Sequence, residues 1–299
     1  MQNQIRTRIG FVGLGAMGAP LAGRLLYRNK VYGTNRTKSK ASALVAEGLI
    51  WRETPREVAA ASEVVFSMVT DDDALASVSA GPDGILAGLR PGALYIDMST
   101  VSPSASRGLA ERVRSRGAVM IDAPVSGGVA AAETGTLSIM VGGTEAGYRA
   151  AEPLLLRLGS TVTHVGGNGQ GLLLDLAINI SLAAQKLAFN EGVLLAERGG
   201  IDPALAARAI GSPMPSERSP LVLDRPGRAR LPEQEPVDLA LMHKDIRLAL
   251  KTASESGVDL PVAAAVESAL SQAQDIACGA SDVARLYKGL ATERAGNTA

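Results

Sequence analysis

Three glycines close to the amino terminus have a spacing that lets the backbone approach a ligand closely. The run Gly13-Leu14-Gly15-Ala16-Met17-Gly18 follows the apolar segment Ile9–Val12 and opens an amphipathic stretch. In a strand–turn–helix unit, the first glycine permits the tight turn, the second admits a pyrophosphate, and the third lets helix and strand pack closely. The positive end of the helix attracts the same anion. We therefore expect a dinucleotide at these six residues; the alternative is a glycine turn with a structural role only.

The residues after the second expected strand indicate which dinucleotide is bound. Proteins that bind NAD usually place Asp or Glu there, where the carboxylate accepts a hydrogen bond from the ribose 2′-hydroxyl. This chain has Asn35-Arg36-Thr37 instead, with Lys40 close behind. Arg36 and Thr37 can donate charge-assisted hydrogen bonds to a 2′-phosphate. We expect NADPH or NADP rather than NAD; the alternative is a solvated basic helix start.

A second set of donors suits a small anion. Ser126, Gly127 and Gly128 offer a hydroxyl and consecutive backbone N–H groups, which together form a concave donor set for a carboxylate. The alternative is a glycine turn between two strands.

The elements that must position these residues follow from periodicity. In the first half, short apolar runs alternate with amphipathic stretches, which is typical of a doubly wound α/β sheet. The expected strands are Arg8–Val12, Val31–Thr34, Val64–Met68, Ala93–Asp97, Val119–Asp122, Leu137–Val141 and Thr161–Val165. The expected helices between them include Met17–Tyr27, Lys38–Ala46, Ser104–Ser115 and Glu145–Leu158.

From Gln170 onward the pattern is helical. Gln170–Arg198 contains no proline, which predicts one long helix ended by Gly199-Gly200. Further expected elements are helices at Pro203–Ile210, Val237–Ser256, Pro261–Ala277 and Asp282–Leu290, and a proline-rich loop at Asp224–Pro236. The expected fold is thus α/β: a doubly wound Rossmann-type domain over residues 1–166, then an all-α domain over residues 167–299 with a long interdomain helix.

Length and composition narrow the class of protein. The 299 residues suffice for two domains, and 30 basic residues balance 30 acidic ones, so no net charge recruits nucleic acid or an anionic membrane. The lone Cys278 cannot form an internal disulfide or a thiolate metal cluster, which fits a reducing compartment, and we expect no metal site. The polar amino terminus is no secretory signal, and we find no apolar run near about 18 residues. We expect a cytoplasmic protein.

Several segments together resemble the β-hydroxyacid dehydrogenase family, which includes 3-hydroxyisobutyrate dehydrogenases. They are Gly13–Gly18 (GLGAMG), Asp97–Thr100 (DMST), Asp122–Gly128 (DAPVSGG), Ala131–Leu137 (AAETGTL), Gly169–Asn179 (GQGLLLDLAIN) and Met242–Ile246 (MHKDI). The resemblance runs from about Arg8 to Leu290, and DAPVSGG is its most specific part. It implies a homodimer or higher homo-oligomer, which would also cover the apolar surface of the long helix.

The resemblance also assigns roles to individual residues. It implies that Ser126–Gly128 hold a substrate carboxylate, that Asn179 contacts the substrate, and that Lys244 lies near substrate and cofactor. It places Val69, Thr70 and Thr100 at the cofactor. For Lys244 the alternative is an ion pair on a helix surface, and for either threonine it is a loop cap.

One residue departs from the family. The resemblance implies a lysine where this chain has Asp175, and that lysine stabilises the substrate oxygen as a hydroxyl becomes a carbonyl. A carboxylate repels a developing alkoxide but stabilises a cationic iminium ion, and a protonated carboxyl could donate to an imine nitrogen. The related imine reductases and reductive aminases often have Asp or Tyr at this position and use NADPH, whereas the intact DAPVSGG segment favours the dehydrogenases. The alternative for Asp175 is an acidic residue favoured near a helix start by the helix dipole.

Three hypotheses follow. The first is an NADPH-dependent imine reductase in which Asp175 donates a proton or stabilises an iminium ion, with an imine or amine as the small-molecule partner. The second is a dehydrogenase of β-hydroxyacids and their keto acids, with Lys244 or water transferring the proton. The third is a catalytically silent or engineered NADPH-binding variant.

Overall fold

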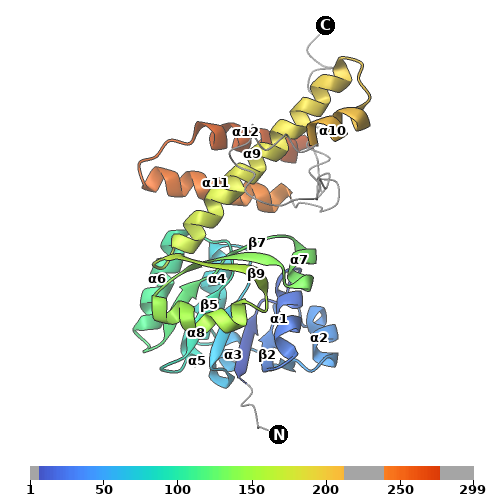
Figure 1. Ribbon diagram of the computed structural model, residues 1–299. Coiled ribbons are helices and arrows are strands. Elements are labelled where there is room, and N and C mark those ends of the chain that lie inside the picture. Colours follow the sequence, from blue (N-terminus) through green and yellow to red (C-terminus); the bar gives the residue numbers. More distant parts are fainter. Residues whose placement is uncertain (1–6, 212–238, 277–299) are drawn as a thin grey trace. The chain divides into compact units, whose positions relative to one another are not determined.

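The computed structural model describes residues 7–211 and 239–276 (Figure 1). The expected loop at Asp224–Pro236, the expected helix at Asp282–Leu290, and Cys278 lie outside the described residues. The chain divides into two compact units, Met1–Leu176 and Ala177–Ala299. This division falls inside the long helix that begins at Gln170, and the expected domain boundary at residue 166 stays a prediction.

The first unit is built on a nine-stranded sheet with the order β3-β2-β1-β4-β5-β6-β8-β7, in which β9 pairs with β8. The strands are β1 (Arg8–Val12), β2 (Lys30–Thr34), β3 (Ile50–Trp51), β4 (Val64–Ser67), β5 (Leu94–Asp97), β6 (Val119–Asp122), β7 (Val125–Ser126), β8 (Leu137–Gly142) and β9 (Gly159–Gly166). From β3 to β6 all neighbours are parallel, and β8 pairs antiparallel with β6 and β7. The strand order reverses at β1, and ligands of open α/β sheets bind at the carboxyl ends of strands beside such a reversal.

Helices cover both faces of this sheet (Figure 1). They are α1 (Gly18–Leu26), η1 (Lys38–Ala41), α2 (Ser42–Ala46), α3 (Pro55–Ala61), α4 (Asp72–Ser79), α5 (Ile85–Gly88), α6 (Pro103–Arg114), α7 (Val129–Thr134) and α8 (Glu145–Leu155). Alternate residues of β1 pack into separate cores: Phe11 lies in the core with α1, whereas Val12 lies in the core with α3. This alternation is the two-residue period of a strand buried on both faces.

The second unit is helical in its described part. It contains most of α9 (Gln170–Arg198), then α10 (Pro203–Gly211), α11 (Leu239–Glu255) and α12 (Pro261–Ile276). Its core is aliphatic and consists of Ala183, Leu187, Leu239, Ile246, Val266 and Leu270. The expected fold class, a Rossmann-type sheet followed by a helical region with one long helix, is confirmed.

Helix α9 is strongly apolar, although the sequence contains no unbroken apolar run of membrane-spanning length. It is the one helix of the described residues long and apolar enough to cross a membrane by length and composition, with a mean hydropathy of 1.5 over its best window. Asp175, Asn179 and Lys186 interrupt it, which is why no unbroken run exists. A single helix of this kind is weak support for a membrane span, because core helices have the same composition.

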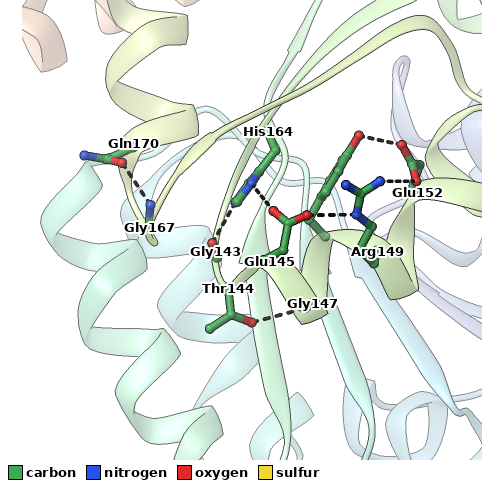
Figure 2. A network of polar contacts seen from close by, with 10 residues as sticks. Gly143, Thr144, Glu145, Gly147, Arg149, Glu152, His164, Gly167 and Gln170 are labelled. Atoms are coloured by element: carbon green, nitrogen blue, oxygen red, sulfur yellow. Dashed lines mark hydrogen bonds and ion pairs between the residues drawn. The ribbon is translucent and has the colours of Figure 1, made fainter.

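Polar contacts hold β9, the strand before α9, against the start of α8 (Figure 2). His164 Nε2 lies 2.9 Å from the Gly143 carbonyl oxygen, and His164 Nδ1 lies 3.0 Å from Glu145 Oε2. The imidazole also stacks on Tyr148, with ring centroids 5.0 Å apart. These contacts use both ring nitrogens and one face of the imidazole, so His164 joins β9 to the segment that opens α8.

Candidate active site

The three glycines of the first turn have distinct structural roles. Gly13 has φ +95°, and a Cβ there would lie 2.2 Å from the Met68 carbonyl oxygen. A Cβ on Gly18 would lie 2.0 Å from the Gly13 carbonyl oxygen, so helix α1 can pack on this turn only with glycine there. A Cβ on Gly15 would meet no heavy atom within 4 Å. Protein packing therefore requires Gly13 and Gly18, whereas Gly15 faces open space that a nicotinamide dinucleotide can use.

Asn35 fixes the glycine turn to the end of β2. Its Oδ1 accepts a hydrogen bond from the Leu14 amide at 3.1 Å, and its Nδ2 donates to the Thr37 carbonyl oxygen at 3.1 Å. The Leu14 side chain is buried. The contact between Leu14 and Asn35 therefore helps to set the conformation of the glycine turn. A contact of either residue with the cofactor stays a prediction.

The basic segment after β2 is exposed, including Arg36 and Thr37. The tertiary structure adds a carboxylate that the local sequence did not indicate: Lys38 Nζ lies 2.7 Å from Glu53 Oε1. The Lys38 ammonium also lies 5.2 Å from the centroid of the Trp51 ring. Lys38 therefore neutralises Glu53, and Arg36 is the stronger candidate for a phosphate contact.

A buried network fixes the loops that follow β4 and β5. Ser67 Oγ and Ser99 Oγ each donate to Asp97 Oδ1 at 2.7 Å, and Ser67 Oγ also bonds the Tyr95 hydroxyl at 2.8 Å. Ser99 Oγ accepts from the Val69 amide at 2.9 Å. All four side chains of the network are fully buried. The network sets the backbone at Val69 and at Thr100, two of the expected cofactor contacts.

Burial raises the pKa of Asp97 from 3.8 to about 6, although the hydrogen bonds from Ser67 and Ser99 oppose that rise. The folded state therefore binds this proton more tightly than the unfolded chain. The resulting stabilisation is complete below pH 3.8 and is lost as the pH rises through about 6.

Asp97→Asn removes this titration. Relative to the variant, the native protein is expected to lose up to about 3 kcal/mol of unfolding free energy as the pH rises from about 4 to about 7. Urea unfolding of both proteins across that pH range measures the difference. A difference that does not change with pH would contradict the assignment.

The start of α9 is seated on another buried carboxylate, Asp122, the first residue of the DAPVSGG motif, whose structural role the local sequence did not indicate. Asp122 Oδ1 accepts from the Gly169 amide at 2.7 Å, and Asp122 Oδ2 accepts from the Leu172 amide at 3.2 Å. Burial raises the pKa of Asp122 to about 6, against the lowering effect of these amides. A Cβ on Gly171 would lie 2.5 Å from the Met140 carbonyl oxygen. The glycines of this segment thus let the helix start approach Asp122 and β8.

Asp175 lies in the second turn of α9 and is only 1% exposed. Its Oδ2 accepts a hydrogen bond from Thr100 Oγ1 at 2.9 Å. Thr100 follows β5, so this carboxyl is held at the carboxyl edge of the parallel sheet, the edge that also carries the glycine turn. A solvated acid favoured only by the helix dipole would not be buried in this way.

The Ser126–Gly128 segment forms a turn between a strand and a helix, not between two strands as the alternative had it. Ser126 ends β7, which pairs with β8, and Gly128 is the N-cap residue of the six-residue helix α7. Gly127 has φ +130° and is exposed. The role of this turn toward a carboxylate stays a prediction.

In the second unit, Asp245 joins two of the expected site residues. Lys244 Nζ lies 3.0 Å from Asp245 Oδ1, and Asn179 Nδ2 donates to Asp245 Oδ2 at 3.5 Å. Burial raises the pKa of Asp245, and the Lys244 ammonium opposes that rise. His243 Nε2 lies 2.9 Å from Glu267 Oε1, as fits a packed histidine. The sequence indicated Asp245 only through its place next to Lys244 in the MHKDI segment.

Two family models match almost the whole chain. The NAD binding domain of 6-phosphogluconate dehydrogenase matches residues 8–166, and the NAD-binding domain of NADP-dependent 3-hydroxyisobutyrate dehydrogenase matches residues 169–290. The chain belongs to the β-hydroxyacid dehydrogenase superfamily. It is therefore an NAD(P)-dependent oxidoreductase with a nicotinamide cofactor, and the open space at Gly15 fits that group.

Individual relatives agree with this family. The chain is 33% identical over 284 residues to 2-(hydroxymethyl)glutarate dehydrogenase of Eubacterium barkeri, covering 94% of each protein. The solved 3-hydroxyisobutyrate dehydrogenase of Mycobacterium tuberculosis with L-serine has a TM-score of 0.82 and 28% identity, covering 96% of this chain and 99% of that one. An imine reductase of Streptomyces aurantiacus has a TM-score of 0.60 and 23% identity over 95% and 99% of the two chains, which shows a shared fold alone.

Proposed function

We propose that this superfamily member is an NADPH-dependent imine reductase in which Asp175 acts on the C=N group. The observation that carries the proposal is the burial of the Asp175 carboxyl at the carboxyl edge of the sheet, bonded to Thr100. The bound nicotinamide supplies the hydride. Asp175 stabilises the cationic iminium ion before the hydride arrives or donates the proton that the nitrogen needs.

Electrostatics favour C=N over C=O reduction at such a site. Two unit charges about 4 Å apart interact by about 4 kcal/mol at an effective dielectric of 20. A carboxylate at that distance attracts an iminium ion and repels the alkoxide that forms when a carbonyl is reduced. The two reactions would differ in rate by orders of magnitude.

We further propose that the remaining expected residues complete the site. Asn179 follows Asp175 by four residues of α9, the spacing that places two side chains on one face of a helix. Asn179 and Lys244 share Asp245 as a hydrogen-bond or ion-pair partner. Asn179 and the Ser126–Gly128 turn orient the substrate, while Lys244, Val69, Thr70 and Thr100 border the cofactor.

The exposed Arg36 supports NADPH as the cofactor. Arg36→Leu is expected to raise KM for NADPH by about tenfold to a hundredfold and to leave KM for NADH nearly unchanged, because a charge-assisted contact to the 2′-phosphate contributes about 1.5–3 kcal/mol. Steady-state kinetics with both cofactors measure this. Arg28→Leu, an exposed arginine after α1, is the matched control for lost surface charge. Equal effects on both cofactors would contradict the assignment.

A β-hydroxyacid dehydrogenase is the second candidate function. Its support is the Ser126–Gly128 turn, with an exposed left-handed Gly127, and the similarity to 2-(hydroxymethyl)glutarate dehydrogenase. In that case Lys244 or water would transfer the proton. A protein that binds NADPH without turnover is the third.

One assay separates the three. The purified protein is mixed with NADPH and either cyclic imines such as 1-pyrroline or small aldehyde and keto acids, and NADPH oxidation is followed; 3-hydroxyacids with NADP test the reverse direction. Imine reduction at least about a hundredfold faster than carbonyl reduction is expected. Turnover of the acids alone indicates the second function, and NADPH binding without any turnover indicates the third.

We propose a homodimer in which α9 is covered by a second copy of the chain. Leu173, Leu182 and Leu195 are 51%, 41% and 76% exposed, and only 22% of the most apolar window of α9 is buried within the chain. Burial of such a surface in a partner is favourable. Light scattering measures the mass in solution, and a monomer would contradict the proposal.

A further inference from the structure

We infer that Glu53 is a specificity-determining residue that restrains the preference of this protein for NADPH over NADH. The inference rests on the proposed binding of NADPH by the basic segment at residues 36–40, and it does not depend on the reaction at the C=N group. NAD enzymes usually carry an acidic residue at the end of their second strand, and this chain has none there. The structure brings a carboxylate to the basic segment from the neighbouring strand instead.

The pairing of β2 with β3 places Glu53 beside the basic segment. Gly33 is in register with Trp51, and the Arg52 amide donates to the Gly33 carbonyl oxygen at 2.9 Å. Glu53 therefore follows β3 at the carboxyl edge of the sheet, where β2 continues into the basic segment. The Glu53 amide donates to Glu57 Oε2 at 2.9 Å, which fixes the backbone of Glu53 just before α3.

The Glu53 carboxylate is paired with a cation of that segment. Lys38 Nζ lies 2.7 Å from Glu53 Oε1, and the hydrogen bond from Lys38 lowers the pKa of Glu53 from its ordinary value. The Lys38 ammonium also lies 5.2 Å from the centroid of the Trp51 ring, so two side chains of the neighbouring strand and its end hold it. The Lys38 and Glu53 side chains are 65% and 66% exposed, so the pair lies open to a bound nucleotide.

The ion pair of Lys38 and Glu53 has no net charge, and this decides how it acts on the two cofactors. The 2′-phosphate of NADPH is negatively charged, so Lys38 attracts it and Glu53 repels it, whereas the 2′-hydroxyl of NADH is neutral. While Glu53 holds Lys38, the basic segment meets the phosphate with the charges of Arg36 and Lys40 only. An exposed ion pair contributes little to stability, so its replacement changes the cofactor preference rather than the fold.

Glu53→Gln removes the negative charge of the pair and should lower Kd for NADPH by about threefold to fivefold, the size of effect expected between exposed charges in water. Kd for NADH should stay within about twofold. Lys38→Gln should raise Kd for NADPH by a similar factor. The double variant again has no net charge at the pair, and its Kd for NADPH should return to within about twofold of the native value. Fluorescence titrations of each protein with NADPH and with NADH measure the four constants that each comparison needs.

Glu63→Gln is the matched control. Glu63 is also exposed and ion-paired, with Arg8 at 3.1 Å, but it lies at the amino edge of the same sheet, where β1 and β4 begin. Repeating the titrations at about 1 M salt adds a second readout. The gain of Glu53→Gln should disappear there, because the Debye length falls to about 3 Å.

Three results would each overturn the inference: an unchanged Kd for NADPH in Glu53→Gln, an equal fall in its Kd for NADH, or the same gain in Glu63→Gln. Circular dichroism of each variant verifies that the fold is retained. Equal effects of Arg36→Leu on both cofactors would instead overturn the proposed contact with the 2′-phosphate, whatever Glu53 does.

Discussion

Asp175→Asn is expected to lower kcat for imine reduction by about a thousandfold while leaving KM for NADPH within about threefold. The asparagine keeps the shape of the side chain and an oxygen that can accept from Thr100, so the fold and the hydrogen bond at 2.9 Å are retained. Only the negative charge is lost. An attraction of about 4 kcal/mol between carboxylate and iminium ion corresponds to about three orders of magnitude in rate.

The control and the charge reversal make this prediction specific. Glu191→Gln removes an exposed carboxylate from the same helix and should leave kcat unchanged. Asp175→Lys should abolish imine reduction and, if the charge argument holds, raise oxidation of 3-hydroxyacids with NADP. Circular dichroism of each variant verifies the fold, because a lysine at a position that is 1% exposed places a charge in a buried site. Undiminished imine reduction in the asparagine variant would contradict the assignment of Asp175.

Gly15→Val and Gly18→Ala are expected to have opposite effects on cofactor binding and stability. A side chain on Gly15 meets no protein atom within 4 Å, so Gly15→Val should fold with an unchanged Tm. The same side chain occupies the space of the pyrophosphate and should weaken NADPH binding by about a hundredfold or more, equivalent to about 2.7 kcal/mol. A Cβ on Gly18 would lie 2.0 Å from the Gly13 carbonyl oxygen, so Gly18→Ala should lower the unfolding free energy by about 1–3 kcal/mol or more.

Two measurements on both variants test this contrast. Quenching or energy-transfer fluorescence with NADPH gives Kd, and thermal unfolding without cofactor gives Tm. Each variant serves as the control for the other, because both add a side chain to the same turn. If Gly15→Val bound NADPH as tightly as the native protein, the turn would have the purely structural role that is the alternative reading of its glycines.

The local sequence was sufficient to predict those strands and helices that have a clear apolar pattern of their own. The strands at Arg8–Val12 and Val119–Asp122 have the bounds that their short apolar runs predict, and α9 begins at Gln170 and ends at Arg198 as expected. The family and the nicotinamide cofactor also follow from short contiguous motifs. The strands β3 and β7 were missed because each has two residues, too few for any periodicity.

Tertiary structure alone decided which side chains meet. Thr100 and Asp175 are 75 residues apart, and Gly169 and Asp122 are 47 apart, yet these pairs seat α9 and turn its carboxyl toward the sheet edge. The ion pair between Lys38 and Glu53 is another contact that the tertiary structure alone determines. The physical reason is that periodicity and turn chemistry act over a few residues, whereas a buried carboxyl is specified by donors that only the packed sheet brings within hydrogen-bonding distance.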